Sequence, residues 1–340
     1  MGRIVKHLKN NYKIIIGIII GVVISGCGVY AATVIAASKV EYTDNASLGA
    51  TNVQDAIDKL NTKATTKIKE AEAKCPKGYD CTKSKLCKRA TTLHTETCSN
   101  DDSSYYCQAD GYTLNDTITY GNFGTKGVLA SGDAFDCDVN GDAVYDSATE
   151  RFYYVSDMTN GVTQDSNTAV LIYYNNVSGG IASNSTAYAY DSSGKNNNGP
   201  VTAIKQLPTT SQWKNVSLIN ATRNITDEKN TVRKSAFSYD GYAARLLTAQ
   251  EVSAGCGFTV GSVATGELSS KCKYLMENTT YSSSSLKTYG GWLESSDAPS
   301  PYLAWSVRAR YRRVRDSPVS DIGSYGVRPA IEVLKSNISY

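Results

Sequence analysis

GGWLESSDAPSPYLAWSVRARYRRVRDSPVSDIGSYGVRPAIEV, residues 290–333, is the stretch that decides the fold. It holds two of the three tryptophans of the chain, Trp292 and Trp305. Side chains alternate between the two faces of a strand, so residues 304–312 predict one half-buried strand. Trp305, Val307, Ala309 and Tyr311 would lie on its buried face, and Ser306, Arg308, Arg310 and Arg312 on its outer face.

The outer face of this predicted strand is cationic, and it is either a solvated sheet face or a binding surface. Neither Asp nor Glu interrupts the arginines along the strand, and loops rich in Ser, Pro, Asp and Tyr flank it, which favours binding. Guanidinium groups suit carboxylate, phosphate or sulfate partners because they donate two parallel hydrogen bonds. The candidate ligand-binding residues are Ser296, Asp297, Ser300, Tyr302, Ser306, Arg308, Arg310, Arg312, Arg313, Arg315 and Asp316.

Composition indicates an extracytoplasmic protein with short strands joined by polar turns. The chain has 340 residues, 41% of them hydrophobic, with 24 Tyr but only 5 Phe. That length allows one large domain with attachments. The net charge is +3, so a nucleic-acid partner is not expected and any basic function is local.

The cysteines predict disulfides. There are nine, and the eight that remain after Cys27 show no C-x-x-C spacing, which favours disulfides over metal binding. Residues 75–110 hold five of them and too few apolar residues for a core, so we expect a disulfide-stapled collar with Cys137 as a possible sixth partner. Cys256 and Cys272 enclose a Gly-rich loop and predict a local disulfide.

The N-terminal residues 1–37 predict export. Basic residues precede the apolar run 14–37, which is long enough to cross a bilayer. Three hypotheses stay open: a retained membrane anchor, which ranks first, then a cleaved signal peptide, then lipidation at Cys27. Each places the C-terminal part outside the cytoplasm, at the cell membrane in the first case.

Residues 38–74 predict a linker or a helical stalk. Val53, Ile57, Leu60, Ala64 and Ile68 recur at helical spacing, which is typical of an amphipathic helix. The helix either lies on the domain or self-associates through residues 51–72.

An acidic segment near the start of the remaining domain, residues 111–340, resembles a calcium loop. Its pattern D-x-D-x-N-G-D-x-x-x-D offers oxygen ligands around a Gly turn, which suits Ca²⁺. The candidate ligands are Asp136, Asp138, Asn140, Asp142 and Asp146. Ser147 stands where an EF-hand has its bidentate Glu, and an acidic hairpin turn at Asn140–Gly141 is the alternative.

Further along, residues 151–158, 168–177 and 186–191 are aromatic or β-branched runs that predict strands. LPTTSQW, residues 207–213, predicts a loop that enters a helix. A second helix is expected where Thr248 and Glu251 form a capping box, with Leu246, Leu247 and Val252 packed inside.

Together these motifs resemble the formylglycine-generating-enzyme-like branch of the C-type lectin fold. LPTTSQW is similar to its L-P-T-E-x-E-W signature, and YGVRPAIEV, residues 325–333, to its closing G-F/V-R-P motif. The resemblance implies an α+β, C-type-lectin-like domain with short strands and two helices, preceded by the membrane helix, the helical stalk and the disulfide-rich segment. It makes five residues the framework: Trp213, Trp292, Trp305, Arg328 and Pro329. Some relatives are variable proteins of diversity-generating retroelements, which implies that residues 292–328 are a diversified display region.

Three functions follow as hypotheses. The first is a bacterial surface protein that binds an external ligand, such as an anionic protein or glycan. The second is a structural pilus- or fibre-like subunit. The third, an enzyme of the formylglycine branch, is disfavoured because no catalytic motif matches and His7 and His94 are the only histidines, so no catalytic residue is assigned.

Overall fold

The computed structural model describes residues 53–62, 85–99, 107, 112–159, 163–164, 167–257, 270–280, 287–308 and 313–340. The chain divides into two compact units, Met1–Asp80 and Cys81–Tyr340. In the first unit the described residues form a helix at 53–62, inside the expected stalk. The expected anchor at 14–37, with Cys27, and the rest of the stalk lie outside the described residues. No helix of the described residues is long and apolar enough to cross a membrane.

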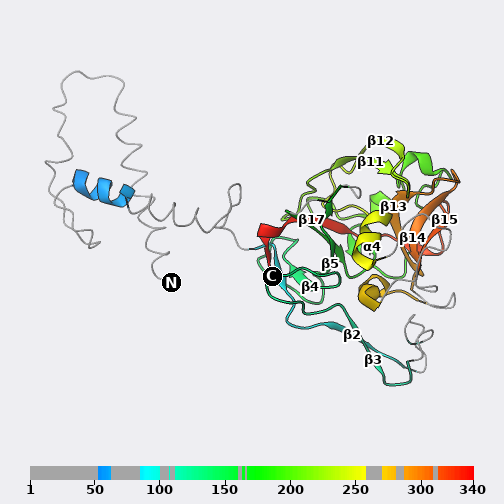
Figure 1. The fold of residues 1–340 in the computed structure, drawn as a ribbon, viewed down its shortest axis with the longest axis horizontal. Coiled ribbons are helices and arrows are strands. Elements are labelled where there is room, and N and C mark those ends of the chain that lie inside the picture. Colours follow the sequence, from blue (N-terminus) through cyan, green and yellow to red (C-terminus); the bar gives the residue numbers. More distant parts are fainter. Residues whose placement is uncertain are drawn as a thin grey trace, which may run out of the picture. The chain divides into compact units, whose positions relative to one another are not determined.

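The second unit is mostly β, so the expected α+β fold class is wrong (Figure 1). Its described α-helix is α4 (Ala249–Cys256), with short 3-10 helices at Asn196–Asn198, Ala203–Gln206, Ser270–Met276 and Lys335–Asn337. The strands are β1 (Cys87–Arg89), β2 (His94–Thr97), β3 (Thr117–Tyr120), β4 (Ala134–Cys137), β5 (Arg151–Ser156), β6 (Met158–Thr159), β7 (Thr163–Gln164), β8 (Thr168–Tyr173), β9 (Val177–Ser178), β10 (Ile181–Ala182), β11 (Thr222–Thr226), β12 (Val232–Ser238), β13 (Gly290–Ser296), β14 (Leu303–Arg308), β15 (Arg313–Pro318), β16 (Tyr325–Gly326), β17 (Ala330–Leu334) and β18 (Ile338–Ser339).

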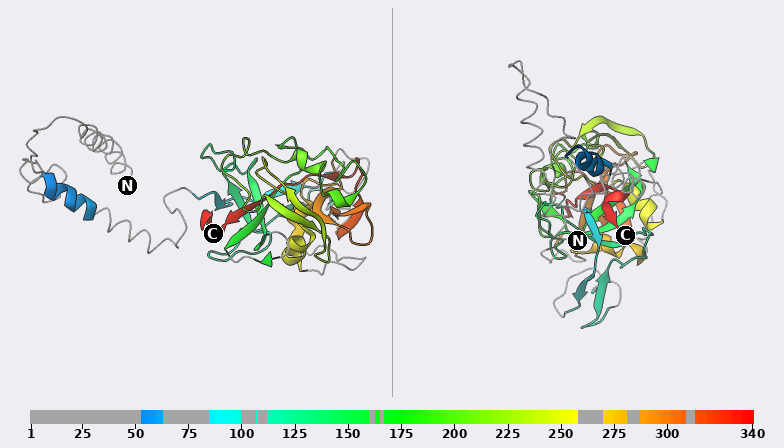
Figure 2. Two further views of the ribbon diagram at one scale, coloured as in Figure 1. Left: turned by 90° about the horizontal axis from the view of Figure 1, so that it is seen from above. Right: turned by 90° about the vertical axis from the view of Figure 1, so that its left-hand side faces the viewer.

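The larger sheet curls into a near-barrel. Its strand order is β17-β8-β5-β4-β1-β18, so the last two strands of the chain lie at opposite edges. Only the 3-10 helix Lys335–Asn337 joins them, and a connection that short spans about 14 Å at most. The two edges must therefore come close together. Figure 2 shows the C-terminal strand beside the cyan strand β1, with which it pairs in parallel.

The first strand of this sheet comes from the segment expected to be a separate collar. β1 pairs with β4 and β18, and Cys87 at its start is fully buried and disulfide-bonded to Cys137. A second disulfide joins Cys98 to Cys107. The collar residues that the structure describes are thus part of the domain, because burying β1 in the sheet supplies the apolar contacts that the segment lacks by itself.

The four-stranded sheet is built from residues 290–326, in the order β15-β14-β13-β16. β13 and β14 are antiparallel, as are β14 and β15, whereas β16 pairs with β13 in parallel. Both faces of β13 are buried. The shorter hairpin β11–β12 contacts β13 through a bridge between Asp227 and Ser296.

One of the two expected helices forms. Thr248 accepts a hydrogen bond from the Glu251 amide, the Glu251 side chain accepts one from the Thr248 amide, and α4 follows. LPTTSQW makes only a turn, in which the Trp213 amide donates to the Thr209 carbonyl. Pro208 holds the preceding Leu207 extended, and Trp213 packs against Phe152 rather than along a helix.

The expected strands at 151–158 and 168–177 are present as β5 and β8, which pair with each other. Residues 186–191 make no strand. Their backbone instead bonds to the four-stranded sheet region, through the Tyr188 amide to the Tyr325 carbonyl and the Asp191 amide to the Val319 carbonyl.

Five charged side chains form a buried network inside the domain. Arg245 donates to both oxygens of Glu251 at 2.5 and 2.8 Å and to Glu332 at 2.7 Å. Arg223 Nε lies 2.9 Å from Glu294 Oε1. All five side chains are at most 1% exposed. Burial raises the pKa of Glu294 in spite of Arg223 and Arg245. This network ties β11, β13, β17 and α4 together.

Candidate functional site

The predicted strand 304–312 is a hairpin instead. β14 ends at Arg308, β15 begins at Arg313, and these two residues are direct partners across the ladder. The joining residues 309–312 lie outside the described residues, and Arg310 and Arg312 with them. Sequence alternation missed the turn because no Gly, Pro or Asn marks it.

The hairpin gathers the described arginines on one face. Direct partners in an antiparallel pair share a face, so Arg308 and Arg313 lie together, next to the pair of Ser306 and Arg315. In a single strand, Arg313 and Arg315 would have shared the face of Trp305. The pairing therefore moves them to the face of Arg308. We call Arg308, Arg313 and Arg315 the arginine face.

This face is covered at Ser306 on β14 and reaches solvent at Arg315 on β15, which is the edge strand of the sheet. Ser306, expected outside, is fully buried, and its Oγ donates to the Arg315 carbonyl at 3.0 Å. The guanidinium of Arg308 lies 5.8 Å from the ring of Tyr325. Arg308 and Arg313 are half-buried, whereas Arg315 is exposed, with Nε 3.5 Å from Asp316.

The loop between β13 and β14, residues 297–302, is held rigidly. The side-chain amide of Asn196 lies within 3.0 Å of the carbonyl oxygens of Asp297, Ser300 and Leu303. The Asn196 backbone amide donates to the Pro301 carbonyl at 2.7 Å. Asn196 is fully buried, so one side chain from a distant 3-10 helix sets the conformation of the loop. A loop held in place loses little entropy on binding.

The turn of the β11–β12 hairpin supports the same loop. Glu228 accepts hydrogen bonds from the Ala298 amide and from the Trp305 indole, both at 3.0 Å. Arg233 donates to the Ala298 carbonyl at 3.5 Å. Sequence analysis did not select Asn196, Glu228 or Arg233, because their contacts span 65 residues or more of the chain.

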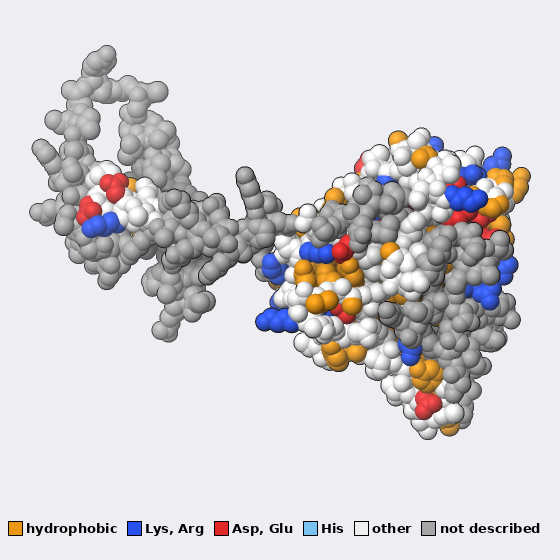
Figure 3. Space-filling view, in the orientation of Figure 1, with side chains coloured by type: hydrophobic (Ala, Val, Ile, Leu, Met, Phe, Trp, Pro, Cys, Tyr) orange, Lys and Arg blue, Asp and Glu red, His pale blue; other side chains and the backbone are white. Residues whose placement is uncertain are grey.

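Of the expected ligand-binding residues in this loop, only Tyr302 is well exposed, at 60%. Ser296 is fully buried and its Oγ donates to the Asn196 carbonyl. Ser300 and Asp316 are half-buried. Asp297 is 6% exposed and accepts from the Ser300 amide. Burial, with repulsion from Glu228 and Asp316, raises the pKa of Asp297 to about 6. Acidic, basic and hydrophobic side chains lie together at this edge of the unit (Figure 3).

The five framework residues are all buried. Trp292 donates to the Tyr188 carbonyl at 2.6 Å, and Trp213 packs against Tyr173. Arg328 donates to the Leu275 carbonyl at 3.0 Å and to the Tyr274 and Glu277 carbonyls. The Pro329 carbonyl accepts from the Tyr173 amide. The local disulfide expected at Cys256 and Cys272 is present.

The acidic segment 136–146 forms a turn whose carboxylates bind the protein itself. Asp136 receives a hydrogen bond from Arg151 Nε at 2.7 Å. Asp138 accepts from the amides of Gly141, Asp142 and Ala143, and Asp146 accepts from Ala148 and Thr149. Asn140 and Asp142 bond to each other. Among the described residues no group of three His, Cys, Asp or Glu side chains is placed to hold a metal ion. Calcium binding stays a prediction.

His94 holds the projecting hairpin β2–β3 to the domain (Figure 1). Its Nδ1 lies 2.6 Å from Glu277 Oε1, and its Nε2 lies 2.6 Å from the Ser147 carbonyl oxygen. Glu277 also accepts from Tyr153, which is buried. Both ring nitrogens of His94 are thus hydrogen-bonded, and the contact joins three segments that are distant in the sequence.

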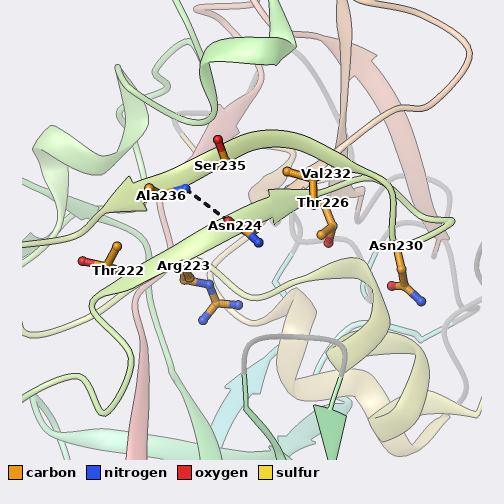
Figure 4. Close-up of a pocket in the computed structure, with 8 residues that line it drawn as sticks. All are labelled: Thr222, Arg223, Asn224, Thr226, Asn230, Val232, Ser235 and Ala236. Carbon is orange, nitrogen blue, oxygen red and sulfur yellow. Dashed lines mark hydrogen bonds between the residues drawn. The ribbon is translucent and has the colours of Figure 1, made fainter.

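A separate hollow of about 600 Å³ lies on the β11–β12 hairpin, which sequence analysis did not single out (Figure 4).

No family model, curated protein or solved structure matches the chain. The resemblance to the formylglycine-generating-enzyme-like branch, and the diversification of residues 292–328, therefore stay predictions.

Proposed function

We propose that this protein acts outside the cytoplasm and binds an extended anionic ligand through the arginine face, with Tyr302 at the opposite end of β14 as a second contact. The observation that carries the proposal is the direct pairing of Arg308 with Arg313. This pairing places three guanidinium groups on one face of the hairpin, and clustered positive side chains attract and orient a negatively charged group. Carboxylate, phosphate and sulfate groups meet this requirement.

Three further observations support the proposal. The loop that presents Tyr302 is held by Asn196 and Glu228, which limits the entropy lost on binding. Exposed Tyr and Arg are the residue types that dominate binding surfaces. The three disulfides among the described residues support a site outside the cytoplasm, where such bonds persist.

The test compares two triple variants of the full-length protein. Arg308→Ser, Arg313→Ser and Arg315→Ser together remove the arginine face. Lys126→Ser, Lys205→Ser and Lys214→Ser remove the same charge from exposed positions elsewhere. Binding to dextran sulfate is measured at a fixed salt concentration, with uncharged dextran as the blank. At about 0.7–1 kcal/mol for each ionic contact, the arginine variant loses roughly 30- to 150-fold in affinity.

The lysine variant is expected to lose at most about threefold, because it changes only the long-range charge. An equal loss in both variants, or none in either, would show that net charge rather than the arginine face attracts the polymer. Repeating the measurement with carboxylated and phosphorylated dextran identifies the preferred anion. Circular dichroism of each variant checks that the fold is retained.

A further inference from the structure

The hollow on the β11–β12 hairpin comes from unequal strand lengths. Arg223 pairs with Phe237 and Thr226 with Val232, so four residues of β11 lie opposite six of β12. The two extra residues make β12 bulge away from its partner. Ala236, at the bulge, has a φ of 47°, in the left-handed region. The bulge leaves a hollow of about 600 Å³ that opens to solvent.

Two amide groups are held in a fixed orientation there (Figure 4). Asn224 Oδ1 accepts from the Ala236 amide at 3.1 Å, and Asn230 Oδ1 accepts from Gln250 Nε2 at 2.9 Å. The Asp227 carbonyl can only accept, so the Gln250 atom that contacts it must be Nε2. The same Nε2 faces Asn230, which must therefore present its acceptor Oδ1 to Gln250. Each Asn Nδ2 therefore points away from its internal partner, and neither donates to another described residue.

The rest of the lining is neutral. Thr222, Thr226 and Ser235 contribute hydroxyl groups, and Val232, which is 48% exposed, contributes an apolar surface. Arg223 is the one charged lining residue, but Figure 4 shows its side chain on the side of β11 opposite Asn224, and its Nε lies 2.9 Å from Glu294. The hollow thus combines hydroxyls, oriented amide donors and a small apolar surface without a facing charge.

We propose that this hollow binds a neutral polyhydroxylated ligand, an uncharged glycan. Sugar hydroxyls both donate and accept, so they match side chains that present hydroxyls beside amide N–H groups. The C–H faces of a sugar suit the methyl groups of Val232 and the threonines. The volume is in the range of small-molecule sites, and the bonded amides need no reordering on binding. The site does not depend on the arginine face.

The experiment screens the full-length protein against an array of neutral and acidic glycans and measures the strongest neutral binder by calorimetry. Asn224→Asp and Asn230→Asp keep the acceptor oxygens that hold Ala236 and Gln250 but replace both N–H donors. Each substitution is expected to weaken binding about 10-fold. Ser235→Trp fills the hollow from an exposed position and abolishes binding.

The arginine-face variant is the control. It should bind the neutral glycan within twofold of the unchanged protein, whether or not dextran sulfate binds. The proposal is overturned if no neutral glycan binds, if only acidic glycans bind, or if affinity survives both Asn substitutions and Ser235→Trp. Thermal unfolding of each variant ensures that lost binding reflects the hollow rather than an unfolded chain.

Discussion

Replacing His94 by Gln is expected to destabilise the protein in a pH-dependent way. The Ser147 carbonyl can only accept, so Nε2 of His94 carries a proton. Nδ1 faces a carboxylate oxygen of Glu277 that is also paired with Tyr153 through its second oxygen. Glu277 accepts from Tyr153 and, below the pKa of His94, from a protonated Nδ1, so that His94 is then a doubly protonated imidazolium. Glutamine keeps some hydrogen bonding but not the charge.

The direction of the pH effect follows from the environment of the ring. Burial alone would lower the pKa of His94, and so would the positive charge of Arg151. The hydrogen bond and charge of Glu277, with the Ser147 carbonyl, outweigh them and raise the pKa above 6.5. Tyr174 packs edge-on against the ring. A raised folded-state pKa means that the stabilisation is fully present below pH 6.5 and is lost as the pH rises through the folded-state value.

The size of the effect follows from two charge-assisted hydrogen bonds. Each contributes about 1.5 kcal/mol, and the side chain is only 20% exposed, so solvent screens them little. His94→Gln should therefore lower the free energy of unfolding by about 2–3 kcal/mol at pH 5.5. Urea unfolding at pH 5.5 and pH 9 measures the difference between variant and unchanged protein, which should shrink at pH 9.

His7→Gln removes the only other histidine of the chain and serves as the control. A difference for His94→Gln that is equal at the two pH values, or larger at pH 9, would refute the charged-imidazolium assignment. A double-mutant cycle with Glu277→Gln should return a coupling of about 1–2 kcal/mol at pH 5.5. Nitrogen chemical shifts of the ring would identify both N–H groups directly.

Three other changes test the energetics of the fold. Arg245→Met removes the ion-pair partner of the buried Glu251 and the nearer of the two arginines that contact Glu332, so it should lower the free energy of unfolding by about 3–5 kcal/mol. A loss below 1 kcal/mol in urea unfolding would contradict the network. Ala236→Gly removes the strain of a left-handed backbone at a non-glycine residue. It should raise the free energy of unfolding by about 0.5–1 kcal/mol and the thermal midpoint with it, whereas a lower midpoint would count against strain there. Asp138→Ala frees three amides and should cost about 2–3 kcal/mol without calcium; a calcium-dependent rise in Tm that only the unchanged protein shows would instead favour the calcium loop.

Local signals predicted those parts of the fold that depend on near neighbours. The capping box of α4 joins Thr248 to Glu251, three residues apart, and the helix begins where the sequence indicates. The runs that became β5 and β8 are rich in β-branched and aromatic side chains, so they favour strands whichever strand they pair with. The Cys256–Cys272 disulfide also closes a short loop.

Tertiary structure decided the rest because strand pairing depends on which edges meet. Alternation placed Arg308 away from Trp305 and Val307, but only the pairing with β15 brought Arg313 and Arg315 to its face and buried Ser306. LPTTSQW carries helical signals, yet packing of Trp213 against Phe152 holds it as a turn. Pairing with β4 and β18 places β1, which comes from the segment expected to form a separate collar, inside the larger sheet. Contacts between residues so distant in the chain leave no local pattern, and the sequence alone therefore showed the arginines and the tryptophans but not the surface that they form.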